Sequence, residues 1–292
     1  MEEVVKHIKH CRPKLAEASV KTYSNILRNL YKDLWKDEFD YHKLIDHHTA
    51  VMTHLESVKY NVRKTILAAL VCISTGKVQE AYRTSMIEDA RKYNAEQKEN
   101  KMTDAQRENW LSWQEIEDHM EKLKTKYYYI FKEKNPKADD LLLLQKYIVL
   151  CCYVLIPPRR CQDFCLMKVK GYDKTKDNFF EKGKFVFSKY KTAKFSGVQI
   201  EKVPKSLEIL LTKWIKLTTN ENLFFDFYGH PLTAAGMTKI LNSIFSPKKV
   251  SVNILRHVYI TEKSAPLMKQ LEETAAAMGH STSTQKLYVK ED

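Results

Sequence analysis

Residues 139–164 read DDLLLLQKYIVLCCYVLIPPRRCQDF, and this stretch decides the fold. From Asp139 to Val154 the side chains are apolar nearly all round, which is the pattern of a helix buried at the centre of a domain. Pro157 and Pro158 then stop that helix because proline cannot continue it. The stretch therefore predicts a domain built around one central helix, with an Arg-Arg pair directly after it.

The domain boundary lies upstream of this helix. Residues 94–109 (NAEQKENKMTDAQREN) contain Met102 as their one large apolar side chain, so they cannot bury enough surface to join a core. We predict a linker over residues 94–111. Ser112 and Glu115 then have the spacing of a capping box, which marks a helix start. A second domain is expected over residues 112–292.

The N-terminal segment has helical periodicity. Apolar residues recur at helical spacing from Ser19 to Leu34, and two further helical stretches follow over residues 57–72 and 78–93. These stretches predict a helical domain over residues 1–93.

Residues 185–189 (FVFSK) and 198–203 (VQIEKV) alternate apolar and polar side chains around Gly197, which predicts a short hairpin or small antiparallel sheet. Only 7 glycines and 8 prolines occur in 292 residues, too few for a protein rich in tight turns. We therefore expect a mainly α protein, with an N-terminal helical bundle and an α+β second domain.

The charge balance indicates a polyanionic partner. The chain has 49 basic and 36 acidic residues, a net charge of +13 and a pI near 9.2. Residues 112–292 carry 30 basic and 20 acidic residues, against 19 and 16 in residues 1–111. No apolar run approaches the roughly 18 residues of a membrane span, and the N-terminus lacks a signal-peptide core. We expect an intracellular protein that binds nucleic acid rather than a membrane.

The six cysteines lie mostly in apolar or helical stretches and form no paired CxxC motif. This favours buried thiols over a zinc site or disulfides. No metal and no cofactor is expected.

Several polar residues could carry chemistry, although each one alone also has an ordinary structural explanation. Arg160 follows the two prolines, and we expect Asp163, one turn further on, to orient it. Lys191 lies in the basic turn 188–197, together with Lys189 and Lys194, where an exposed turn is the commoner reason for such charge.

Further candidates lie downstream. Asn253 and Arg256 stand in an otherwise apolar helical stretch, where polar groups require partners. His280 precedes Tyr288 by eight residues, in a segment rich in serine and threonine that is typical of a helix junction.

Two arginines, a lysine, a histidine and a tyrosine in this order suit transesterification at a phosphodiester. A tyrosine hydroxyl can displace a 5′ oxygen and retain the bond energy in a phosphotyrosine. Arginines stabilise the charge on the non-bridging oxygens, and lysine or histidine supports proton transfer. This chemistry needs no metal.

The same residues resemble the motifs of the tyrosine recombinase or phage integrase family. Residues 160–167 (RCQDFCLM) are similar to the family's R-x-x-D/E-L-x-x-M/L box, which selects Arg160 over the arginine before it. Lys191-Thr192 is similar to its K-T motif, residues 253–256 to its H-x-x-R box, and Gly279-His280 and Tyr288 to its last two sites. The segment IPPRRCQDF also resembles integrases of virophages, giant viruses and related eukaryotic mobile elements.

The resemblance implies a tyrosine recombinase fold that clamps double-stranded DNA. Residues 1–93 would be the SAM-like core-binding domain and residues 112–292 the catalytic domain, with Arg160, Lys191, Asn253, Arg256, His280 and Tyr288 as catalytic residues. It also implies a tetramer on paired DNA sites, acting in a host nucleus or viral factory if the gene is viral. Asn253 departs from the family's histidine and cannot shuttle a proton.

Two alternatives share these residues. A type IB topoisomerase would use them to relax supercoiled DNA. A catalytically weakened DNA-binding relative is favoured only by Asn253.

Overall fold

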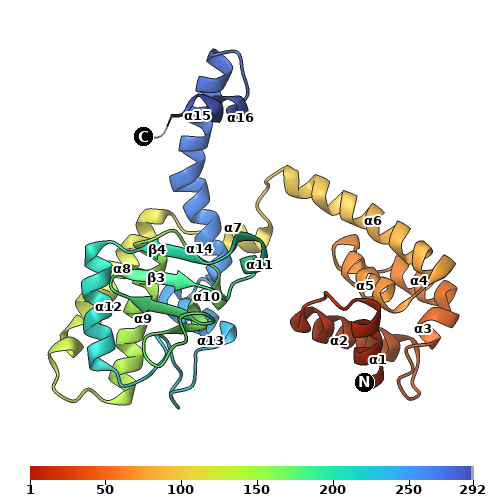
Figure 1. Ribbon diagram of the computed structural model, residues 1–292, viewed down its shortest axis with the longest axis horizontal. Helices are drawn as coiled ribbons and strands as arrows, with labels where there is room; N and C mark the ends of the chain where they lie inside the picture. Colours follow the sequence, from red (N-terminus) through yellow and green to blue (C-terminus); the bar gives the residue numbers. More distant parts are fainter. Residues whose placement is uncertain (291–292) are drawn as a thin grey trace. The chain divides into compact units, whose positions relative to one another are not determined.

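The computed structural model describes residues 1–290 and divides into two compact units between Met102 and Thr103 (Figure 1). Each unit has a separate hydrophobic core. The division falls inside the segment 94–111 that the sequence analysis treats as a linker.

The first unit is entirely helical. Its core is formed by side chains at helical spacing, among them Leu27, Tyr31, Leu67 and Tyr82. The Tyr82 hydroxyl donates a hydrogen bond to the carbonyl of Leu44 at 2.6 Å. The helices are α1 (Glu2–Cys11), α2 (Glu17–Leu34), α3 (Lys43–Asp46), α4 (His48–Glu56), α5 (Tyr60–Ile73) and α6 (Gly76–Lys98).

The connection between the units is shorter than the predicted linker. Helix α6 continues to Lys98, and α7 (Asp104–Asn109) begins at a capping box of Thr103 and Gln106. Asn109 Oδ1 accepts a hydrogen bond from the backbone N–H of Lys249, which ties α7 to the rest of the second unit. The polar composition of residues 94–109 does not prevent them from being helical. Helix α6 extends into this segment with few buried side chains, and a local cap stabilises α7.

The second unit surrounds the central helix that the sequence predicts. Helix α9 (Ala138–Val154) buries nine side chains, from Leu144 to Tyr153. The capping box of Ser112 and Glu115 at the start of α8 (Trp113–Tyr127) is confirmed. The other helices before the C-terminal segment are η1 (Tyr128–Lys132), α10 (Cys161–Cys165), α11 (Ala193–Ser196), α12 (Lys205–Leu217) and α13 (Ala234–Phe245).

A four-stranded sheet lies beside α9, in the order β1 (Met167–Lys168), β2 (Asn178–Glu181), β3 (Lys184–Phe187), β4 (Gln199–Lys202). The expected antiparallel pairing of β3 with β4 is confirmed, with Val186 opposite Ile200. The sheet is nevertheless mixed, which corrects the expectation of an antiparallel sheet, because β1 pairs with β2 in parallel. Strand β1 has two residues, too few for a period-2 pattern to reveal.

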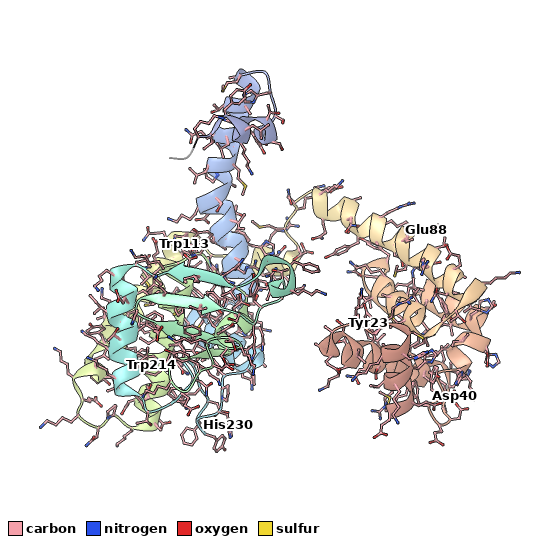
Figure 2. The ribbon with its side chains drawn as sticks, viewed as in Figure 1. Tyr23, Asp40, Glu88, Trp113, Trp214 and His230 are labelled. Atoms are coloured by element: carbon pink, nitrogen blue, oxygen red, sulfur yellow. The ribbon has the colours of Figure 1, made fainter. Side chains whose placement is uncertain are left out.

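Helix α12 completes the core with Trp214, which Figure 2 labels. Its ring stacks on Phe225, and its Nε1–H donates to the carbonyl of Leu223 at 2.9 Å. Both polar and apolar parts of this buried indole are therefore satisfied.

The C-terminal segment is one long helical run followed by a short return. Helix α14 (Val252–Tyr259) passes through the π-helical turn η2 (Ile260–Ser264) into α15 (Ala265–Ala277). Helix α15 leads away from the sheet, with α16 (Thr282–Gln285) and η3 (Lys286–Tyr288) at its far end (Figure 1). Within residues 1–290 no helix is both long and apolar enough to cross a membrane.

Candidate active site

A hollow of about 250 Å³ lies where the end of α9, the start of α10, the β3–β4 hairpin and α14 meet. Three arginines line it, from segments almost a hundred residues apart in the sequence. The lining residues are Pro157, Pro158, Arg159, Arg160, Asp163, Tyr190, Thr192, Gln199, Glu201 and Arg256.

The structure brings together two of the predicted site residues, Arg160 and Arg256. Arg160 is the N-cap residue of α10 and has the extended backbone that is usual at this position. Arg256 lies on α14, whose first turn is capped by Ser251 and whose opposite face buries Leu255 and Val258. Both side chains are half-buried, so each presents a cation to the hollow.

The sequence predicts that Asp163 pairs with Arg160. In the structure Asp163 pairs with Arg159 instead. Arg159 Nε donates to Asp163 Oδ2 at 3.1 Å. The physical reason is that Arg159 precedes the N-cap and its chain folds back over the first turn of α10. Burial raises the pKa of the Asp163 carboxyl, and the positive charges of Arg159, Arg160 and Arg256 oppose that rise only in part.

Asn178 joins α10 to the segment directly after strand β3, and it was not among the residues predicted from the sequence. Its side chain is fully buried and makes four hydrogen bonds. The amide Nδ2 donates to the carbonyls of Asp163 and Lys189, at 3.0 and 2.8 Å. Its Oδ1 accepts from the N–H groups of Ser188 and Lys189. All its partners are backbone groups, so no residue pattern could have revealed this role.

Lys191 stands in the turn between β3 and α11 and is exposed. Its two neighbours, Tyr190 and Thr192, line the hollow, so the turn that carries Lys191 borders the hollow, although Lys191 itself is not among the lining residues. Lys189 is instead held by Asp177, with Nζ 3.0 Å from Oδ1. Among residues 1–290 Lys191 forms no ion pair, so of these two lysines it is the one free to meet an anion.

Asn253 is exposed on α14, one turn before Arg256. Residues three apart lie on neighbouring positions of one helix face. Asn253 therefore lies near the hollow without being among its lining residues. His257, the next position after Arg256, is exposed as well.

His280 and Tyr288 lie together, but not at the hollow. Their rings stack at 5.6 Å between centroids with an interplanar angle of 18°. Tyr288 is 67% exposed, and His280 Nε2 is buried without a hydrogen-bond partner among the described residues. The helical run from Arg256 to Ala277 spans roughly 30 Å at ~1.5 Å per residue. The structure thus separates the predicted nucleophile from the arginines.

The part of the chain that the structure describes contains no cluster of three or more His, Cys, Asp or Glu side chains able to hold a metal ion. The polar side chains that line the hollow carry three guanidinium groups, two carboxylates, one amide and two hydroxyls, and the arginines among them suit an anion.

Comparison with protein-family models, with curated proteins and with solved structures finds no match for this chain.

Proposed function

We propose that the chain is a site-specific DNA recombinase or integrase that cleaves and rejoins DNA strands through a covalent 3′-phosphotyrosine. The observation that carries the proposal is the hollow that unites Arg160 and Arg256. The sequence motifs assign both arginines to one phosphate, and the two residues lie in separate elements. The net charge of +13 and the free Lys191 in the turn that borders the hollow favour DNA as the phosphate's source.

In the proposed step the Tyr288 oxygen forms a bond to phosphorus, and the bond from phosphorus to the 5′ oxygen breaks. The phenolic proton leaves Tyr288, with His280 beside it as the acceptor, and Lys191 donates a proton to the departing oxygen. Arg160 and Arg256 stabilise the charge that gathers on the non-bridging oxygens. Asn253 donates a hydrogen bond to phosphate but takes no part in proton transfer.

Tyr288 has to reach the hollow for this step. The proposal therefore includes delivery of the C-terminal segment from Ala265 onward, by movement within one chain or from a neighbouring copy on paired DNA sites. The exposed apolar side chains of α15, Leu267, Met268 and Leu271, are consistent with a segment that gains contacts when it is delivered.

The first prediction concerns Tyr288. Nicked duplexes made from the terminal DNA of the genetic element that encodes the protein should trap a covalent protein–DNA complex. Tyr288→Phe should abolish this complex and leave duplex binding within about twofold, because only the nucleophile is removed. Denaturing gel electrophoresis measures the complex. Mapping the position at which the protein is joined to the cut strand identifies the attacked phosphate. A complex that persists in Tyr288→Phe would contradict the proposal.

A mixing experiment separates the two routes of delivery. Arg256→Ala and Tyr288→Phe are each inactive alone under the proposal. If Tyr288 is delivered from a neighbouring copy, the mixture regains covalent complex. If delivery is within one chain, the mixture stays inactive.

Relaxation of supercoiled plasmid without strand exchange would instead identify a topoisomerase.

A further inference from the structure

Arg159 is the most firmly held of the three arginines in the hollow. Its Nε donates to Asp163 at 3.1 Å, and its Nη2 donates to Gln199 Oε1 at 3.0 Å. Its guanidinium carbon lies 3.7 Å from the centroid of the Phe187 ring. The side chain is 19% exposed. Three contacts from α10, β4 and β3 therefore fix one guanidinium plane.

This arrangement leaves donors free. A guanidinium has five N–H groups in a rigid fork, and the two hydrogen bonds use two of them. No hydrogen bond among residues 1–290 uses Nη1. An arginine placed only to neutralise Asp163 has no need to line the hollow, whereas Arg159 does so beside Arg160 and Arg256.

The net charge of the residues that line the hollow also depends on Arg159. Three arginines oppose Asp163 and Glu201, so one net positive charge remains. A phosphodiester carries a single negative charge, which this balance matches. Without Arg159 the lining would be neutral, and Asp163, which is 2% exposed, would be a buried acid without its partner.

We propose that Arg159 is a further phosphate-binding residue of this site, already positioned by Asp163, Gln199 and Phe187 before DNA arrives. This inference rests on the proposed function and adds to it a third cation that the sequence motifs do not assign. The advantage is that a preorganised guanidinium loses little freedom on binding and needs no rearrangement when charge develops on the phosphate.

The test uses two versions of the nicked duplex. In one, the phosphate that Tyr288 attacks is natural, and in the other this phosphate is replaced by a methylphosphonate. A methylphosphonate lacks the negative charge, so a variant that lacks a cation for that oxygen is penalised less on it. Arg159→Ala should form covalent complex about 100-fold more slowly than the unmodified protein on phosphate. On methylphosphonate most of that loss should disappear.

Controls keep the outcomes separate. Arg159→Lys, which keeps the charge but loses the fork, should recover only part of the rate on phosphate. If Arg159→Ala alone folds poorly, Arg159→Ala/Asp163→Asn takes its place, because the second change removes the unpaired buried charge. This double variant should show the same preference for methylphosphonate. A loss of equal size on both duplexes would assign Arg159 a structural role and overturn the inference. Absence of complex with the unmodified protein would instead overturn the proposed function, and the inference with it.

Discussion

At the scale of single residues, the thiols of the second unit differ sharply in their environment. A hydrogen bond from Cys165 lowers the pKa of Cys161, the first residue of α10. Burial raises the pKa of Cys151 to about 12 and raises that of Cys152 well above its usual range. Only the thiolate is nucleophilic, so reactivity follows these pKa values.

We therefore predict that iodoacetamide at pH 8 alkylates Cys161 first. The test uses a Cys11→Ser background, because Cys11 is also half-buried. Because the hydrogen bond from Cys165 holds the pKa of Cys161 below that of an ordinary thiol, its alkylation rate should fall less on acidification from pH 8 than the rate of free cysteine measured in parallel. Peptide mass spectrometry measures the modified site, and Cys161→Ser is the control. Equal reactivity of Cys151 in the folded protein would contradict the prediction.

Also at this scale, the candidate site was only partly predictable from the sequence. The structure places Arg160 and Arg256, which the motif spacing singled out, at one hollow. The partner of Asp163 was predicted wrongly, since the path of the chain before a helix is not periodic. The order of residues also gave no information on the position of Tyr288, which depends on where α15 points.

At the scale of elements, helices α5 and α6 are clamped by one buried ion pair. Arg63 Nε and Nη2 each lie 2.7 Å from an Asp89 oxygen, and the Asp89 side chain is 2% exposed. This bidentate pairing raises the pKa of Arg63, mainly through the hydrogen bonds that Arg63 donates to Asp89. Such a pair is costly to break because one charge then stays buried.

We predict that Asp89→Ala or Arg63→Ala lowers the free energy of unfolding of the first unit by about 3 kcal/mol. Hydrogen exchange of the α5 and α6 amides in the full chain measures this loss. The matched control is Glu17→Ala, which removes an exposed pair with Lys9 and should cost less than about 0.5 kcal/mol. Unchanged protection in Asp89→Ala would show that the ion pair does not hold the two helices together.

The helices were more predictable than the sheet at this scale. The central helix α9 and the cap of α8 follow from long apolar runs and from a four-residue motif. Strands β1 and β2 escaped prediction because β1 is two residues long and β2 buries both faces, so neither alternates.

At the scale of the whole molecule, two units with separate cores carry an excess of positive charge. If about six phosphates are contacted, the logarithm of the DNA affinity should fall with the logarithm of the salt concentration at a slope of about −5. Arg256→Ala should reduce this slope by about one. Fluorescence anisotropy with a labelled duplex measures both, and a slope near zero would exclude a DNA clamp.

The π-helical turn η2 at the base of α15 also sets how that helix is aimed. Glu262 in this turn accepts a hydrogen bond from the backbone N–H of Trp113 at 2.8 Å, and Tyr259 just before it packs edge-on against the Trp113 ring. A π turn holds one more residue than an α turn. Because an α turn holds fewer residues, tightening η2 to α would rotate the helix beyond it about its axis. The direction of α15, and with it the place of Tyr288, therefore depends on the hydrogen-bond register of η2, beside which Glu262 and Tyr259 contact Trp113.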